Sequence, residues 1–309
     1  MLAFIQRHSA GLLILAALCG FIFPDTSAAI FPYLPYILFF LMLFTLVGIQ
    51  PRELIRTLRE STVWGYAILH SLGCTTLGTG LGVLFHASPS VILAIAGVAA
   101  TGSLFATPAI ARSVGLDPRQ AMAMTIATTL LMPAVLYLNL CVFQDQAFTL
   151  NLSEYLQRLL IYIAGPMVIS GIVFRLISPH TLQHAHRRLS SITILLVFTF
   201  PFGLVGPFRE AFDQSAQAAF IYLLIASALC VIFFSFAFVF YRRHSLNSGL
   251  LSALTAANRN VLLTYTVAGS YLGSEYVILM AAIQLPTYTL PLIVRAISRY
   301  YATSPTPSS

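Results

Sequence analysis

Residues 255–264 read T-A-A-N-R-N-V-L-L-T and place one arginine between two asparagines, inside an otherwise apolar segment of membrane-spanning length. A charged side chain at the bilayer centre costs roughly 2.5–3.5 kcal/mol on insertion scales, so such residues usually face a cavity or the protein interior. Asparagine disfavours helix interiors because its amide competes for backbone hydrogen bonds. We therefore expect the helix to be interrupted at residues 258–260. Irregular backbone at this depth is tolerated only where it is buried in protein or lines a cavity.

The composition is that of a polytopic membrane protein. The 309 residues are 58% hydrophobic and 8% charged, and the mean hydropathy is +0.88. Soluble domains carry about 25% charged residues. The net charge of +7 arises from sixteen arginines that mostly flank the hydrophobic segments, which indicates membrane topology and not nucleic-acid binding. The four cysteines are scattered singly and have neither metal-site nor disulfide spacing.

Hydrophobic windows long enough for a ~30 Å hydrocarbon core predict ten spanning helices. Their approximate limits are 10–23, 33–50, 62–86, 89–113, 118–142, 155–177, 191–207, 216–241, 246–270 and 275–298. We interpret the first as an uncleaved helix and not as a signal peptide, because further spans follow it. The polar tail 302–309 is expected to be disordered.

The arginines are distributed asymmetrically about these spans. Thirteen of the sixteen fall on one side, Arg158 and Arg209 fall on the other, and Arg259 lies within a span. Cytoplasmic loops accumulate Lys and Arg, so both termini are expected in the cytoplasm, and we expect a bacterial inner (plasma) membrane protein. All nine acids fall in predicted loops or helix ends. The membrane interior is therefore expected to hold one fixed positive charge and no carboxylate.

The ten helices divide into two sets of five with opposite orientation, residues 1–150 and 151–301. The fourth span is interrupted at 102–108, where glycine, serine and proline occur, and the ninth at 258–260. Inverted repeats with paired broken helices are the best sequence indication of a secondary transporter's midplane site. Proline and glycine are also ordinary in membrane helices, which is the alternative interpretation.

Two spacings support the repeat. Pro108 and Arg259 lie 151 positions apart, close to half of the 309-residue chain, and Pro133 and Pro286 in the helices that follow lie 153 apart. Each broken helix directs a half-helix N-terminus, with about half a positive charge and free N–H donors, toward the membrane centre. Together with Arg259 these two ends predict a positive pocket and an anionic substrate.

Three stretches carry a resemblance to a known family. They are residues 35–54, P-Y-I-L-F-F-L-M-L-F-T-L-V-G-I-Q-P-R-E-L, residues 102–133, and residues 258–261, N-R-N-V. In these stretches the chain resembles the bile acid:sodium symporter family of the bile acid, arsenite and riboflavin transporter group. The resemblance implies that broken helices 4 and 9 cross in a core of helices 3–5 and 8–10, beside a panel of helices 1, 2, 6 and 7. Substrate would bind between core and panel, with alternating access by rocking.

The sequence departs from that family at the positions that hold sodium. The family's Ser-Asn pair in the fourth helix falls on Thr107-Pro108, and its glutamate in the ninth helix falls on Thr255. Its glutamine in the third helix falls on His70, and its glutamine in the ninth helix falls on Arg259. Of the first sodium site only a threonine is kept, as Thr125. Sodium requires several oxygen ligands. Pro108 offers no side-chain oxygen and Arg259 would repel a cation.

We therefore expect the Arg259 guanidinium to act as a tethered cation in place of sodium. Transport of a small organic anion would then be sodium-independent: facilitated diffusion, exchange, or proton-coupled through His70. Sodium-coupled symport of a bile-acid-like anion is the alternative. No cofactor is expected. The partners are an organic anion and membrane lipid, and both a monomer and a homo-oligomer are compatible with the sequence.

The candidate substrate-binding residues each have a structural alternative. Arg259 either contacts substrate or bonds carbonyls freed by the helix break, and Asn258 and Asn260 either contact substrate or cap the half-helices. His70 is either functional or a packing histidine. Threonines can bond to their own helix instead. The full candidate set is Arg259, Asn258, Asn260, Thr107, Pro108, Thr125, Thr255, His70 and Gln284, with Thr128 and Thr129 as further lining residues.

Other functional classes find less support. His180, His184 and His186 suggest a metal site, but the neighbouring arginines and the lack of acids favour a solvated cytoplasmic loop. The sequence contains no H-E-x-x-H, no G-x-S-x-G and no lysine, so an enzyme is not expected. A non-transporting membrane sensor or scaffold, or an anion channel, is the alternative from another class.

Overall fold

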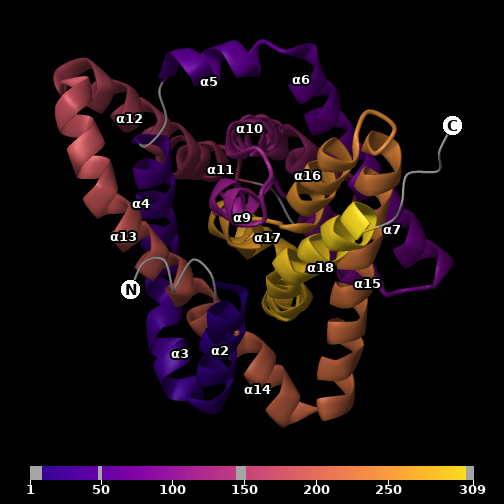
Figure 1. Ribbon diagram of the computed structural model, residues 1–309. Helices are drawn as coiled ribbons and strands as arrows, with labels where there is room; N and C mark the ends of the chain where they lie inside the picture. The colour runs from indigo at the N-terminus through magenta and orange to yellow at the C-terminus, as the bar shows by residue number, and fades with distance from the viewer. Residues whose placement is uncertain (1–8, 48–50, 144–150, 304–309) are drawn as a thin grey trace, which may run out of the picture.

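The computed structural model describes residues 9–47, 51–143 and 151–303, and every regular element in these ranges is a helix (Figure 1). Helical segments that are long and apolar enough to cross a membrane are Pro24–Val47, Ser61–Leu84, Pro118–Phe143, Leu152–Leu176, Leu195–Gln214, Ala216–Tyr241 and Val261–Tyr301. Shorter apolar helices are Gly11–Ile22, Pro89–Ala100 and Leu246–Ala257. The prediction of an all-α membrane protein is confirmed at this level.

The helices follow one another with short connections. In chain order they are α2 (Ser9–Ile22), α3 (Pro24–Ile30), η1 (Phe31–Tyr33), α4 (Leu34–Val47), α5 (Pro51–Leu58), α6 (Ser61–Ile68), η2 (Leu69–Gly73), α7 (Cys74–Leu84), α8 (Pro89–Ala100), α9 (Thr107–Ser113), α10 (Pro118–Phe143), α11 (Leu152–Leu159), η3 (Leu160–Ala164), α12 (Gly165–Leu176), α13 (Pro179–Leu204), α14 (Gly206–Gln214), α15 (Ala216–Tyr241), α16 (Leu246–Ala257), α17 (Val261–Ala282) and α18 (Gln284–Thr303). The elements η2 and η3 are π-helical turns within longer helices.

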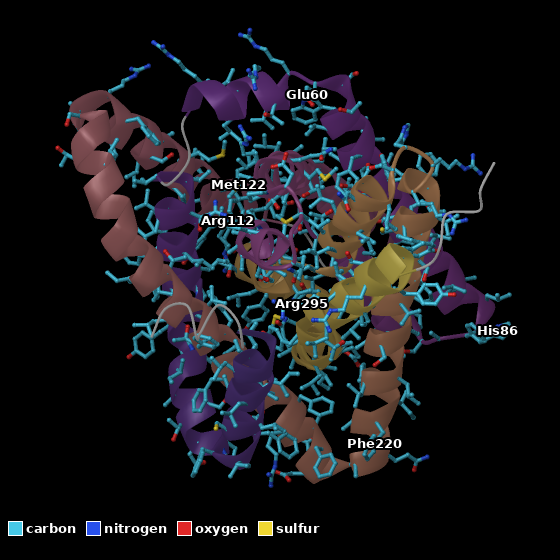
Figure 2. The ribbon with its side chains drawn as sticks, in the orientation of Figure 1. Glu60, His86, Arg112, Met122, Phe220 and Arg295 are labelled. Carbon is cyan, nitrogen blue, oxygen red and sulfur yellow. The ribbon has the colours of Figure 1, made fainter. Side chains whose placement is uncertain are left out.

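The side chains are sorted as a lipid environment requires. Met122 is 1% exposed and lies inside the bundle, whereas Glu60 and His86 lie at its periphery (Figure 2). Large apolar side chains are exposed on the flanks, among them Phe220 at 57% and Leu224 at 70%. Water would penalise such a surface, and lipid would not.

Both interruptions predicted from the sequence are present. Residues 101–106 separate α8 from α9, and residues 258–260 separate α16 from α17. Two irregular points lie near the predicted tenth span, 275–298: Gly273 falls in the predicted connection before it, and Ile283 interrupts the span itself. The backbone at Gly273 has φ 77° and ψ 178°, a conformation that essentially only glycine adopts, and Ile283 separates α17 from α18.

One predicted loop is helical. The segment that carries His180, His184 and His186 belongs to α13, which begins at Pro179. Ser178 is its N-cap and accepts a hydrogen bond at 3.3 Å from the amide of Thr181. A capping serine followed by proline indicates the start of a helix. The prediction of a loop instead followed the polar composition of the segment. The segment is helical where we expected a loop, its solvated cytoplasmic position stays a prediction, and the three imidazoles lie outside the described side chains.

Two groups of packed helices border the interrupted segments, and they also contact each other, for example through α4 and α17. α13 packs against α2 and α4, and α12 packs against α4, all on the left of Figure 1. α8 packs against α7, α10 and α17, and its residues from Leu93 to Ala100 are all buried. The interrupted segments lie where α8, α16 and α17 end or begin.

Candidate functional site

The two interrupted segments complete each other's backbone hydrogen bonds. The amide of Leu104 donates to the carbonyl of Asn258 at 2.8 Å, and the amide of Asn260 donates to the carbonyl of Gly102 at 2.9 Å. These bonds make Ser103 and Arg259 an isolated antiparallel bridge. Unpaired backbone inside a membrane protein is costly, so each break supplies the partners that the other lacks.

Side chains tie the breaks to each other and to α10. Asn258 Nδ2 donates to Thr107 Oγ1 at 2.8 Å, and the amide of Ser103 donates to Thr128 Oγ1 at 3.0 Å. Gly102 packs so closely that a Cβ there would lie 2.9 Å from the backbone N and Cα of Thr129. The two paired breaks, residues 101–106 and 258–260, are therefore closely packed in the interior, and we call this pair of segments the crossing.

The Arg259 guanidinium lies inside this crossing and is 2% exposed. Its Nη1 donates to the carbonyls of Ala99 at 2.9 Å and Thr101 at 2.8 Å, and lies 2.8 Å from Nε2 of His70. The Cζ atom stands 4.4 Å from the ring centroid of Phe233. Ala99 belongs to the last turn of α8, where carbonyls lack helical partners and the helix dipole is negative.

The positive charge of Arg259 thus meets carbonyl dipoles and an aromatic face, and no acid among the described side chains is buried. The sequence-based prediction considered only the positive dipole ends of the two half-helices beside Arg259. The structure adds the C-terminal end of α8, and the guanidinium caps it. The structural alternative for Arg259, bonding to carbonyls freed by the break, is realised. Direct contact with substrate stays a prediction, and Nε and Nη2 have no partner in the described part of the chain.

A chain of hydrogen bonds runs on from Arg259 through His70. Nδ1 of His70 lies 3.1 Å from the hydroxyl of Tyr66, which donates to Thr255 Oγ1 at 2.8 Å. Thr255 donates in turn to the carbonyl of Leu251 at 2.6 Å. This path connects the break to α6 and α16. His70 is therefore buried with both ring nitrogens in polar contact, as the packing alternative predicts, and a functional role for it stays a prediction.

A small cavity of about 20 Å³ adjoins the crossing, room for about one water molecule. One wall is apolar and comes from leucines of α4 and from α13, including Phe200. The other lining residues come from the two breaks and the first turns of α17 and α18, and the polar ones among them are Arg259, Asn260, Gln284 and Tyr288. The cavity therefore lies between the two groups of helices.

Asn260 is the most informative residue in this lining. It is fully buried, and neither polar atom of its amide has a hydrogen-bond partner among the described residues. It stands at the N-cap of α17 but makes no side-chain cap bond. The capping alternative therefore does not hold for Asn260. A buried amide with an unused donor and acceptor is costly, and a bound ligand would satisfy it.

The other candidates are divided between cavity and packing. Arg259, Asn260 and Gln284 line the cavity, and Gln284 Oε1 accepts a bond from Tyr288 at 2.7 Å. The six that do not line it are Asn258, Thr107, Pro108, Thr125, Thr255 and His70. Thr125 bonds to its own helix at Ala121, as the structural alternative predicts, and so does Thr128 at Met124. The hydroxyl of Thr129 has no partner in the described ranges.

Three site residues escaped the sequence analysis. Tyr66 lies four positions before His70, and Tyr288 lies four positions after Gln284. Neighbouring positions on one helix face were therefore a usable signal for both. Phe233 is one of 23 phenylalanines and carries no such signal.

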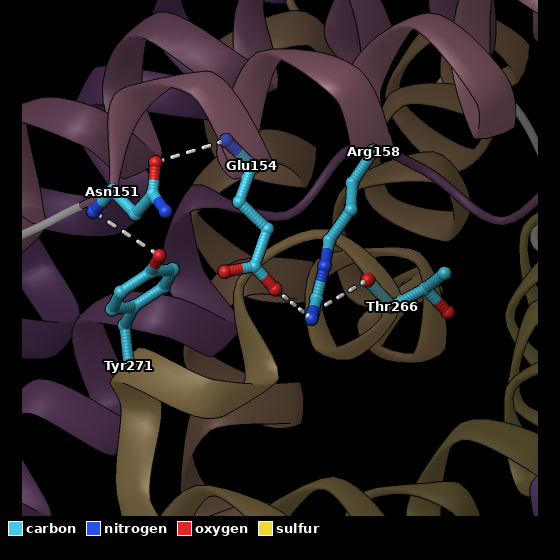
Figure 3. A network of polar contacts seen from close by, with 5 residues as sticks. All are labelled: Asn151, Glu154, Arg158, Thr266 and Tyr271. Carbon is cyan, nitrogen blue, oxygen red and sulfur yellow. Dashed lines mark hydrogen bonds and ion pairs between the residues drawn. The ribbon is translucent and has the colours of Figure 1, made fainter.

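A second polar network joins α11 to α17 (Figure 3). The amide of Asn151 donates to the hydroxyl of Tyr271 at 3.2 Å, and Arg158 Nη1 donates to the carbonyl of Thr266 at 3.4 Å. Glu154 forms an ion pair with Arg158. In the predicted topology this network lies on the arginine-poor side of the membrane.

Comparison with protein-family models and with curated proteins found no match for this chain. The geometry of the crossing and of the adjoining cavity therefore carries the functional argument.

Proposed function

We propose that this chain is a secondary transporter that moves a small organic anion by alternating access. In this proposal the ten spans form two inverted five-helix repeats, residues 1–150 and 151–301, in a bacterial inner membrane with both termini cytoplasmic. Paired broken helices that meet in the interior are the arrangement from which many transporters build a midplane site. The proposal keeps the resemblance to the bile acid:sodium symporter family but not its coupling ion.

The observation that carries the proposal is the position of the Arg259 guanidinium at the end of α8. Carbonyl oxygens such as those of Ala99 and Thr101 are the ligands that a bound sodium ion needs. Here both accept hydrogen bonds from Nη1, at 2.9 and 2.8 Å. A side chain that supplies the positive charge and occupies the oxygens leaves no place there for a free cation. Transport is therefore sodium-independent in this proposal.

The lining of the cavity supports alternating access. This lining comes from α4 and α13 and from the crossing, α17 and α18, so separating these two sets of helices would enlarge the cavity. The network of Arg158 and Thr266 joins α11 to α17 and would have to break if that side opened. In this proposal the structure is a closed state, and rocking would open the cavity to either side.

Asn260 provides the first test. Asn260→Leu removes a buried amide without hydrogen-bond partners among the described residues, so we expect a melting temperature equal to or above that of the wild type. The variant should lose at least tenfold in affinity for a transported anion, about 1.4 kcal/mol. Thermal shift in detergent with taurocholate, pyruvate and benzenesulfonate measures both effects, since a bound anion stabilises by mass action.

Asn258→Leu is the matched control. It breaks the 2.8 Å bond to Thr107, so it should lower stability by about 1–3 kcal/mol. If Asn260→Leu were equally destabilised and kept the anion-dependent shift, Asn260 would be structural and the site would lie elsewhere.

A further inference from the structure

Both ring nitrogens of His70 are in polar contact in the interior. The residue is 2% exposed and sits on the π-helical turn η2, a feature that is frequent at functional sites. Nδ1 lies 3.1 Å from the hydroxyl of Tyr66. Nε2 lies 2.8 Å from Arg259 Nη1 and 3.1 Å from the carbonyl of Thr101.

We assign the ring protons of His70 from these contacts. A guanidinium can only donate, so in this assignment Nε2 accepts from Nη1 and carries no proton, and the two Nη1 hydrogens are shared among Nε2 and the carbonyls of Ala99 and Thr101. Nδ1 then holds the single ring proton and donates to Tyr66, which donates to Thr255, which donates to Leu251. Every donor in this chain points away from Arg259. The ring is neutral in this state.

A proton on Nε2 would have a hydrogen-bond acceptor ready. The carbonyl of Thr101, 3.1 Å away, now accepts from Nη1 and could accept from a protonated Nε2 instead. The protonated ring would then stand against the guanidinium, and one of the two donors must move. Nε and Nη2 of Arg259 have no partner within the described residues, so the side chain has unused donors to offer elsewhere.

The surroundings offer no charge to balance a second cation. The titratable groups around the ring and the guanidinium are Tyr66 of α6, Cys74 of α7, Cys230 and Tyr241 of α15, and Arg259 itself. α8 and α16 contain no titratable side chain, and those of α10 are on its exposed positions or ends. No described carboxylate is buried. Two adjacent cations in such an interior repel strongly.

We propose that His70 is the proton site of a proton–anion symporter, in which a proton on Nε2 and an anion in the cavity beside Arg259 bind together. This rests on the proposed transport function and names its coupling ion. An anion in the cavity lined by Arg259 and Asn260 supplies the negative charge that the protonated ring needs. By linkage, the proton raises anion affinity as much as the anion raises proton affinity.

The charges of this cycle balance. The empty carrier has one buried positive charge, that of Arg259. The loaded carrier has two positive charges and one monovalent anion, which again sum to one. Each cycle therefore moves one proton and one anion together and transfers no net charge. Neither bond formation nor an oxidant is involved.

The test uses the full chain in proteoliposomes that contain a pH-sensitive dye. Taurocholate and benzenesulfonate are the transported probes, because a sulfonate stays ionised and carries no proton across lipid by itself. We expect anion entry to be accompanied by proton entry at a ratio near one. A gradient of one pH unit should drive up to about tenfold anion accumulation, and a potassium–valinomycin potential should not alter it.

His70→Gln is the matched variant. Its amide oxygen can accept from Arg259 and its amide nitrogen can donate to Tyr66, but it cannot take up a proton. We expect the proton-to-anion ratio to fall to near zero and the pH-driven accumulation to disappear. His244→Gln, which removes an exposed histidine, should keep the wild-type ratio.

The outcomes separate the two proposals. Saturable anion movement in the wild type without accompanying protons would overturn the role of His70 and leave the transporter standing, as would a His70→Gln variant with the wild-type ratio. Absence of saturable movement of either sulfonate would contradict the transport function itself. The wild-type ratio decides the question even if the His70→Gln variant fails to fold.

Discussion

Arg259→Ala is expected to abolish anion transport, with a loss of at least a hundredfold in rate, or about 2.7 kcal/mol. The substitution leaves the carbonyls of Ala99 and Thr101 without a donor in the interior and removes the stacking on Phe233. Orphaned buried acceptors and a lost cation–π contact should together lower the free energy of unfolding by about 2–4 kcal/mol. Initial rates of flux in proteoliposomes and thermal unfolding in detergent measure the two effects.

Two further variants separate charge from geometry. Arg259→Lys keeps the positive charge but has no planar fork, so it should recover part of the stability and little of the transport. Arg112→Ala removes an exposed arginine at the end of α9 and should change neither measurement. Wild-type flux and stability in Arg259→Ala would show that the guanidinium is dispensable, and the proposed mechanism would be wrong.

Gly102→Ala is expected to have the second largest effect. Its Cβ would stand 2.9 Å from the N, Cα and Oγ1 atoms of Thr129, closer than real Cβ contacts come. The backbone of α10 cannot yield without moving the bonds that join the two breaks. Overpacking of this kind usually costs about 1–3 kcal/mol. We expect that loss of stability, together with a large loss of transport.

Gly80→Ala provides the comparison. It lies in α7, where the added methyl group would have no neighbouring atom within 4 Å, and alanine is the better helix former by about 1 kcal/mol. Its melting temperature should equal or exceed that of the wild type. If Gly102→Ala and Gly80→Ala melted at the same temperature, close approach between the 101–106 segment and α10 would not be required.

The sequence was informative wherever the membrane imposes a simple rule. Apolar length predicts most of the helices, and an arginine flanked by two asparagines predicts the break at 258–260 because each of these residues disfavours an apolar helix interior. The position of α13 was misjudged. Its first turns are polar, and hydropathy alone treats polar turns as loop although Ser178 and Pro179 mark a helix start.

The details of the site depend on tertiary contacts that no local pattern encodes. Nothing in the residues around Arg259 indicates that its guanidinium bonds to the carbonyls at the end of α8. That placement depends on carbonyls about 160 positions earlier in the chain, such as that of Ala99, and on Phe233. Asn258 and Asn260 look alike in the sequence, yet one bonds to Thr107 and the other has no partner in the described part.

The most direct test of the proposed mechanism is flux of a sulfonate or carboxylate anion in proteoliposomes with sodium replaced by choline on both sides at constant pH. Because Arg259 already occupies the carbonyl oxygens of Ala99 and Thr101, we predict the same initial rate in sodium and in choline. Uptake that vanishes in choline and returns in proportion to added sodium would contradict it.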